Sequence, residues 1–272
     1  MTAMHVDAAQ AARLHERILT TEARHGLRSP IFRWAIAPAL AAWPLLLLLS
    51  GQDRTLTICL SPRATLLDGA LADIEARLAA IDPARWAGEW TLMIVAMMFP
   101  LLVPMIGHVA ARSYAFRRER SVALFVAGYT FTWAAAVMMT SIVLVVARSG
   151  LALSAWAPWG GLIGCALAAL WQISAAKARA VNRCHGTVPL RPAGTAADRD
   201  AIRFGLLHGS RCVRACLPTM ALPLLGSHGI GAMAVIFTIL LAERARQTPQ
   251  YGLSAVVLLL LGLTTVMQPP SG

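Results

Sequence analysis

The sequence has few charged and few aromatic residues, and its positive charge comes almost entirely from arginine. Charged residues make up 14% of the 272 positions and aromatic residues 7%. Soluble domains average about 25% charged residues, so this composition argues against an ordinary soluble domain. Lys177 is the single lysine among 24 basic residues, and 13 acidic residues leave a formal net charge of +11.

Several signatures of enzymes, pumps and secreted proteins are missing. We find no glycine-rich phosphate loop, no paired-carboxylate site and no nucleophile elbow, which argues against ATP-driven transport and hydrolysis. Five cysteines are an odd number, so they cannot all pair within one chain, and no disulfide framework is indicated. Residues 1–30 lack the apolar core of a cleavable signal peptide, so we expect insertion through the first spanning helix.

The sequence is instead rich in long apolar blocks. Hydrophobic residues make up 57% of the chain, and the mean hydropathy is +0.62. Blocks of about 20 apolar residues match the length of a helix that crosses a bilayer, in which every backbone polar group must be satisfied internally. We therefore predict an all-α, polytopic membrane helix bundle with about seven transmembrane helices. The predicted spans are 31–50, 90–111, 122–147, 160–176, 201–225, 230–242 and 251–267.

The connections between the spans set the predicted orientation. Residues 1–30 carry four arginines and residues 177–203 carry six basic residues, so both belong on the cytoplasmic side. Residues 51–89 carry six acids against four arginines and form an external loop, whose segment 66–78 reads as an amphipathic helix. The alternation places the amino terminus inside and the carboxyl terminus outside. This arrangement explains the basic charge without a nucleic-acid partner.

The domain organisation that follows from these spans is simple. Residues 1–30 form a cytoplasmic segment, residues 31–267 form a single transmembrane domain that includes the external loop, and residues 268–272 form a short tail. We detect no internal repeat or linker. The lipid bilayer is therefore the first partner that the sequence predicts.

One predicted span carries four possible metal ligands on a single face. His208, Cys212, Cys216 and Met220 follow one another at steps of four residues, so each lies one helical turn beyond the last. Thiol and thioether ligands suit Cu(I), whereas Zn(II) gains little from a thioether. The alternative is that the sulfur atoms only fill the core, where cysteine and methionine are common.

A second group of sulfur atoms lies in the span 90–111. Met97, Met98 and Met105 could complete a metal site or relay an ion. Pro100 and Pro104 lie one turn apart in the same span, and each removes a backbone donor, so we expect a kinked helix there.

Three further polar residues stand near these groups. Cys184, just beyond the fourth predicted span, could be the first ligand to receive a metal at the cytoplasmic face. Arg211 and Arg214 lie within the fifth span, where a charge at mid-membrane costs at least about 2.5 kcal/mol. They could line a polar cavity or gate, or they could snorkel or pair with backbone carbonyls.

Several motifs along the chain can be read together: Trp90-x-x-Met93-x-x-Ala96-Met97-Met98-x-Pro100, Gly128-Tyr129-x-x-x-Trp133, Lys177, Gly205-x-x-His208-Gly209-x-x-Cys212-x-x-x-Cys216-x-x-x-Met220 and Glu243-Arg244. These motifs resemble a bacterial family of predicted metal-binding integral membrane proteins, which includes a membrane copper chaperone that helps to mature a tyrosinase. The resemblance covers about residues 85–262. This chain departs from the pattern at Ala180 and Ala215, where the family has cysteines.

The resemblance implies a non-enzymatic metal-handling protein of the bacterial cytoplasmic (inner) membrane, which binds Cu(I) and delivers it to a partner copper enzyme. Two other classes stay open. The helices could scaffold a membrane complex as an accessory subunit without metal, or the kinked span and the two arginines could line the cavity of a small-molecule transporter. The expected primary ligands are His208, Cys212, Cys216 and Met220, supported by Met97, Met98, Met105 and Cys184.

Overall fold

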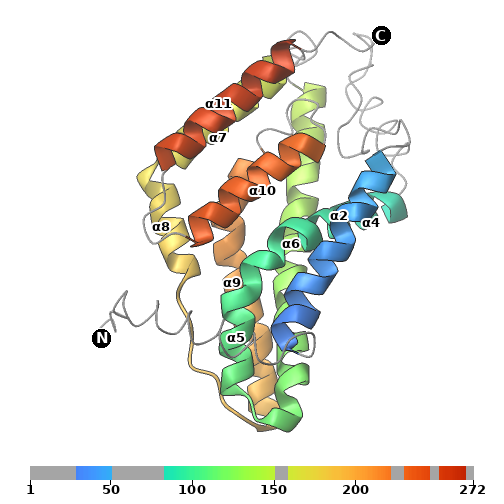
Figure 1. The fold of residues 1–272 in the computed structure, drawn as a ribbon, viewed down its shortest axis with the longest axis vertical. Coiled ribbons are helices and arrows are strands. Elements are labelled where there is room, and N and C mark those ends of the chain that lie inside the picture. Colours follow the sequence, from blue (N-terminus) through green and yellow to red (C-terminus); the bar gives the residue numbers. More distant parts are fainter. Residues whose placement is uncertain (1–28, 51–82, 151–158, 222–229, 246–250, 268–272) are drawn as a thin grey trace.

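The computed structural model describes residues 29–50, 83–150, 159–221, 230–245 and 251–267 (Figure 1). These parts are helical and contain no strand, which confirms the all-α prediction for them. The α-helices are α2 (Ala37–Ser50), α4 (Pro83–Met98), α5 (Val103–Arg112), α6 (Arg118–Gly150), α7 (Gly160–Gln172), α8 (Ala175–Cys184), α9 (Gly194–Ala221), α10 (Ile230–Ala245) and α11 (Tyr251–Met267). Short π or 3-10 turns are η2 (Phe32–Ile36), η3 (Pro100–Leu102) and η4 (Ala115–Arg117).

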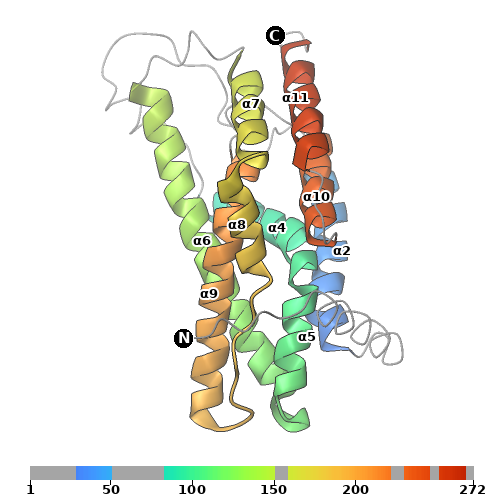
Figure 2. The ribbon, with the colours of Figure 1, turned by 90° about the vertical axis from the view of Figure 1, so that its left-hand side faces the viewer.

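Two helix pairs organise the bundle. Helix α6 packs most extensively against α9, and α7 packs against α11 (Figures 1 and 2). The first pair starts at the lower end in Figure 2, beside the turn that joins α5 to α6, whereas the second pair occupies the upper end. Helix α8 follows α7 and packs against α9. Helix α9 therefore lies where both pairs meet.

Glycine allows the backbones of α6 and α9 to approach closely. A Cβ atom on Gly205 of α9 would lie 2.2 Å from the carbonyl oxygen of Phe125. A Cβ atom on Gly128 of α6 would lie 2.6 Å from the carbonyl oxygen of Ile202. Neither position leaves room for a side chain, in the way that small residues bring helices together in membranes. This contact fixes which α6 side chains face α9.

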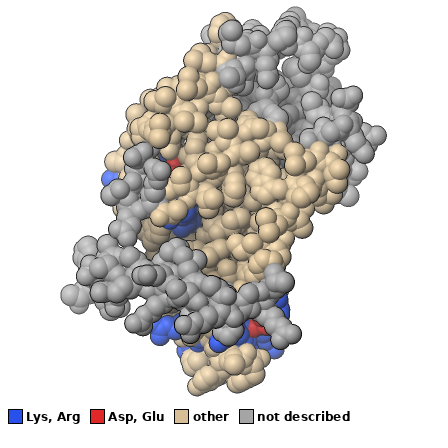
Figure 3. Space-filling view, in the orientation of Figure 1, with Lys and Arg blue, Asp and Glu red and all other residues tan. Residues whose placement is uncertain are grey.

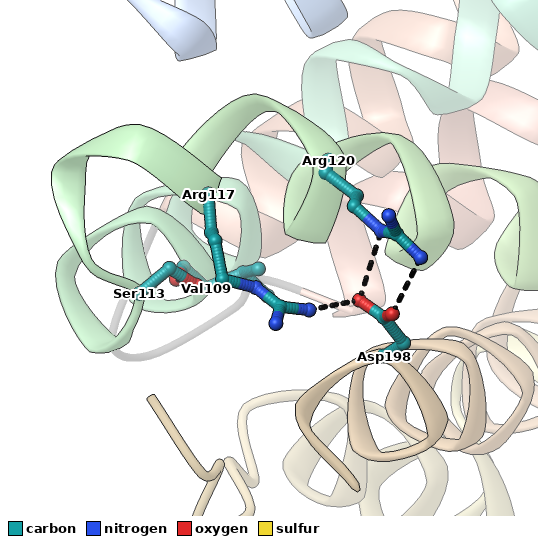
Figure 4. A network of polar contacts seen from close by, with 5 residues as sticks. All are labelled: Val109, Ser113, Arg117, Arg120 and Asp198. Carbon is teal, nitrogen blue, oxygen red and sulfur yellow. Dashed lines mark hydrogen bonds and ion pairs between the residues drawn. The ribbon is translucent and has the colours of Figure 1, made fainter. Parts of the chain in front are cut away.

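An ionic clamp joins the lower ends of the same two helices. Asp198 on α9 accepts hydrogen bonds from Arg117 and from Arg120, whose Nη2 lies 2.7 Å from Asp198 Oδ2 (Figure 4). Partial burial would raise the pKa of Asp198, but these hydrogen bonds hold that pKa below its usual value. Nearby, Ser113 Oγ donates to the carbonyl of Val109 and ends α5.

The predicted span 90–111 is a broken helix. The segments Ala87–Met98 and Pro100–Arg112 meet at an angle of 45°. The break falls at Phe99, directly before Pro100, because proline cannot donate the backbone hydrogen bond that would continue the helix. The expected kink is confirmed.

The number of membrane spans stays a prediction. Within the described residues, Ala115–Val143 is long and apolar enough to cross a bilayer, and the bent pair of segments around Phe99 would add one more. Three shorter apolar helices have 10–17 residues. The predicted cytoplasmic segment 1–30, apart from residues 29 and 30, most of the predicted external loop 51–89 with its expected helix at 66–78, and the tail 268–272 fall outside the described residues.

Candidate metal centre

The four predicted ligands on α9 form one inward-facing row. His208, Cys212, Cys216 and Met220 are all buried, and their spacing of four residues places them on one side of the helix. The Sγ atoms of Cys212 and Cys216 lie 3.9 Å apart. The structure therefore brings two thiols to one point in the core.

Two residues from other helices donate to the first of these thiols. The hydroxyl of Tyr129 on α6 lies 3.3 Å from Cys212 Sγ, and Nη2 of Arg244 on α10 lies 3.7 Å from it. Donors of this kind favour the thiolate, which is the form of cysteine that binds metals. The two donors would therefore stabilise a thiolate at Cys212.

A buried ion pair stands beside the row. Lys177 Nζ lies 2.9 Å from Glu243 Oε2 and donates a second hydrogen bond of 2.9 Å to the carbonyl of Ala215, between the two cysteines in sequence. The exposed fractions of the Lys177 and Glu243 side chains are 0% and 4%. Both residues directly follow predicted spans and so look like solvated charges of the connections, whereas the structure buries both side chains. The side of the membrane on which they lie stays a prediction. Lys177 lies in the first turn of α8, and Glu243 lies in the last turn of α10, which extends to Ala245. Each of these turns places its charged side chain inside the bundle.

His208 is buried without a hydrogen-bond partner for either ring nitrogen among the described residues. Aromatic rings surround it instead. The ring centroids of Phe125, Tyr129 and Phe204 lie 6.1, 5.9 and 6.0 Å from that of the imidazole. An imidazole whose nitrogens are both unsatisfied in the core is a group with capacity for a metal or a water molecule.

Cys184 lies at the end of α8 and is fully buried against the core. The sequence suggests an accessible thiol that receives metal first, whereas the structure buries the Cys184 thiol in the core. His185, the next residue, is exposed. The end of α8 thus presents the imidazole outward and the thiol inward.

The two arginines of α9 have different surroundings. Arg211 Nη1 donates a hydrogen bond of 2.9 Å to the carbonyl of Gly186, which matches the alternative in which a backbone carbonyl satisfies the charge. Arg214 is exposed. The two side chains therefore do not form a common cation pair.

The methionines of the broken span belong to the same core as the α9 row. Met97, Met98 and Met105 are buried, and one continuous hydrophobic cluster contains them together with Cys184, Cys212, Cys216 and Met220. Among the described residues, no group of three or more histidine, cysteine, aspartate or glutamate side chains is gathered closely enough to hold a metal. The structure therefore brings Cys212 and Cys216 together but does not gather His208 or Cys184 with them into a group of three.

Tyr129, Lys177 and Arg244 were missed as members of the site. Each appears in a motif of the family resemblance, but none is a soft metal ligand. Each acts on α9 from another helix, 83, 38 and 32 residues away from its partner on α9. The sequence offers one signal for the two cations: Lys177 directly follows the apolar block 160–176, and Arg244 is the second residue after the block 230–242.

Comparison with known proteins identifies a family. No curated protein and no solved structure matches the chain. The sequence model of a family described as "PpoB2: Copper chaperone" matches residues 87–267, two thirds of the chain. The match contains all the helices from α5 to α11, including the row on α9 and its partners. The earlier resemblance is confirmed, and the chain belongs to the PpoB2 family of copper chaperones.

Proposed function

We propose that this protein binds Cu(I) and passes it to a partner copper enzyme without catalysing a reaction itself. The observation that carries the proposal is the thiol pair of Cys212 and Cys216, 3.9 Å apart, with Tyr129 and Arg244 donating to Cys212. Membership of a copper chaperone family supports the choice of metal.

The proposed primary ligands are Cys212 and Cys216 as thiolates, with the thioether of Met220 and the imidazole of His208 on adjacent turns. Soft sulfur ligands bind Cu(I) in preference to hard cations. His208 contributes a nitrogen that no described protein group occupies. Metal binding releases the thiol protons, so Cu(I) affinity rises with pH.

Met97, Met98, Met105 and Cys184 are the proposed second set of ligands. They complete the site or relay the ion, because they share the buried cluster with the α9 row. The thiol of Cys184 is buried, so it would act as a ligand inside the bundle. His185, the next residue, is exposed at the adjacent surface.

We place the protein in the bacterial cytoplasmic membrane, crossing it about seven times with the amino terminus inside. Large apolar side chains on the outside of the bundle support this location, including Leu48 and Phe131, each 69% exposed, and Leu170, 61% exposed. In Figure 3 the upper part of the described surface is largely uncharged, whereas Lys and Arg gather toward the lower end. In water such an exposed apolar surface would promote aggregation, whereas in a bilayer it would contact the apolar lipid chains.

Titration of the purified protein with Cu(I) against a colorimetric chelator tests the proposal. We expect the wild type to form a stoichiometric Cu(I) complex and the double variant Cys212→Ser/Cys216→Ser to lose it. Cys165→Ser is the matched control, because Cys165 is a buried free cysteine on α7, outside the α9 row. Unchanged Cu(I) binding in the double variant contradicts the proposal.

Delivery is tested with the loaded protein. We expect Cu(I) to move to an apo copper enzyme from the same operon or membrane fraction faster than free chelated Cu(I) does. Co-purification with stoichiometric membrane partners and no bound metal would instead support an accessory-subunit role.

A further inference from the structure

Arg244 is a half-buried cation at the end of α10 that forms no ion pair with a carboxylate among the described residues. Its one hydrogen bond there is donated to Cys212 Sγ at 3.7 Å. The neighbouring carboxylate of Glu243 is engaged by Lys177 at 2.9 Å. A charge that is partly withdrawn from water is stabilised by a compensating charge, and the hydrogen bond of Arg244 goes to the Cys212 sulfur.

The charges around the two thiols do not balance. Lys177 and Glu243 cancel each other in their ion pair. Arg211 points its guanidinium at the carbonyl of Gly186 rather than at the cysteines. The local surroundings of Cys212 and Cys216 therefore carry one excess positive charge, that of Arg244.

The bound metal decides whether this excess charge is neutralised. Cu(I) bound by two thiolates forms a complex of charge −1, which together with Arg244 sums to zero. Zn(II) or Cu(II) bound by the same two thiolates forms a neutral complex, which leaves Arg244 uncompensated. Charge interactions are stronger at a half-buried position beside buried thiols than in water, so this difference favours the monovalent ion.

We propose that Arg244 is the counter-ion that makes the site selective for a soft monovalent cation, Cu(I) or its analogue Ag(I), over divalent ions. The inference rests on the proposed function, because it takes Cys212 and Cys216 as ligands. It adds a specificity-determining residue that is not itself a ligand. Tyr129 shares the same sulfur atom but is neutral, so it stabilises both kinds of complex without selecting between them.

The position of Arg244 is fixed by contacts that do not involve the thiols. Glu243, the preceding residue of α10, is tied to Lys177 of α8, and Lys177 is tied to the α9 backbone at Ala215. These bonds hold the end of α10 against the helix that carries both cysteines. The guanidinium is thus placed beside Cys212 before any metal arrives, and the charge is preorganised.

Competition titrations with Cu(I), Ag(I) and Zn(II) on the purified protein test this inference. We expect Arg244→Met to lower the affinity for Cu(I) and Ag(I) about 10- to 100-fold, the range expected for one charged hydrogen bond, and to leave or raise that for Zn(II). Arg244→Lys keeps the charge and should keep the Cu(I)-to-Zn(II) ratio near that of the wild type. Arg214→Met is the matched control, since Arg214 is an exposed arginine of α9, and it should change nothing.

Arg244→Gln separates charge from hydrogen bonding and also decides the question if the methionine variant does not fold. We expect it to lose selectivity as Arg244→Met does. A wild-type Cu(I)-to-Zn(II) ratio in the glutamine variant overturns the counter-ion role while leaving Cu(I) binding intact. Failure of the proposed function looks different: the wild type binds no Cu(I), or Cys212→Ser/Cys216→Ser still does.

Discussion

Tyr129 on α6 and Cys212 on α9 meet across the most extensive helix contact in the described part of the chain, with 3.3 Å between the hydroxyl oxygen and the sulfur. The contact follows from the glycines at positions 128 and 205, which let the two backbones approach until these side chains touch. The close packing of α6 against α9 therefore also places the Tyr129 hydroxyl against the Cys212 sulfur.

The hydroxyl of Tyr129 should strengthen metal binding at Cys212. Tyr129→Phe removes one hydrogen bond to sulfur, worth about 1 kcal/mol, so we expect Cu(I) affinity to fall several-fold with stoichiometry preserved. Competition with a Cu(I) chelator measures the change. Tyr114→Phe is the control, because Tyr114 is exposed at the turn between α5 and α6 and should bind as the wild type does. Equal losses in both variants would argue against a specific role for Tyr129.

The close contact of α6 and α9 should not tolerate a methyl group. Gly205→Ala places a Cβ atom 2.2 Å from a backbone oxygen, and relieving such overpacking costs about 1–3 kcal/mol of unfolding free energy. Gly231→Ala on α10 meets no atom within 4 Å and should be neutral or stabilising, since alanine favours helix. Thermal unfolding in detergent compares the two. A Gly205→Ala protein as stable as the Gly231→Ala protein would contradict this packing.

The buried ion pair should be costly to break and cheaper to remove entirely. Lys177→Met leaves Glu243 charged in the core without its partner, a loss of about 3–5 kcal/mol of stability. The double variant Lys177→Met/Glu243→Met should recover much of that loss, because neither charge is then buried. Arg191→Ala breaks an exposed ion pair with Asp200 and should have little effect. Denaturant unfolding of the wild type, Lys177→Met, Glu243→Met and the double variant measures the coupling, and additive losses would contradict it.

Acid should weaken the clamp at the lower end of α6 and α9. The pKa of Asp198 is lower in the folded protein than in the unfolded chain, so its contribution is fully present above about pH 3.9 and disappears as pH falls through the folded pKa. Asp198→Asn should therefore be less stable than the wild type at neutral pH, and the gap should close below about pH 4. Unfolding curves across this pH range provide the measurement, and a gap that does not change with pH would contradict the assignment.

Features set by local sequence were predictable. The step of four residues from His208 to Met220 predicts one helix face, and that face is buried. Pro100 and Pro104 predict a broken helix, and the break is at Phe99. Both depend on backbone geometry within a few residues.

Features that depend on contacts between helices were not predictable from spacing. Lys177 and Glu243 look like loop charges in the sequence because each follows an apolar block, yet they neutralise each other inside the bundle. Arg244, the next residue of α10, lies 3.7 Å from Cys212 Sγ on α9. Periodicity reports which residues share a face, but it does not report which helix lies opposite.

The central claim is that sulfur from Cys212 and Cys216 binds Cu(I), and copper K-edge X-ray absorption of the loaded protein tests it most directly. The account predicts a first shell dominated by sulfur in the wild type and in Cys165→Ser, and loss of that sulfur shell in Cys212→Ser/Cys216→Ser. A sulfur shell that persists unchanged in the double variant, or a wild-type shell of nitrogen and oxygen alone, would contradict it.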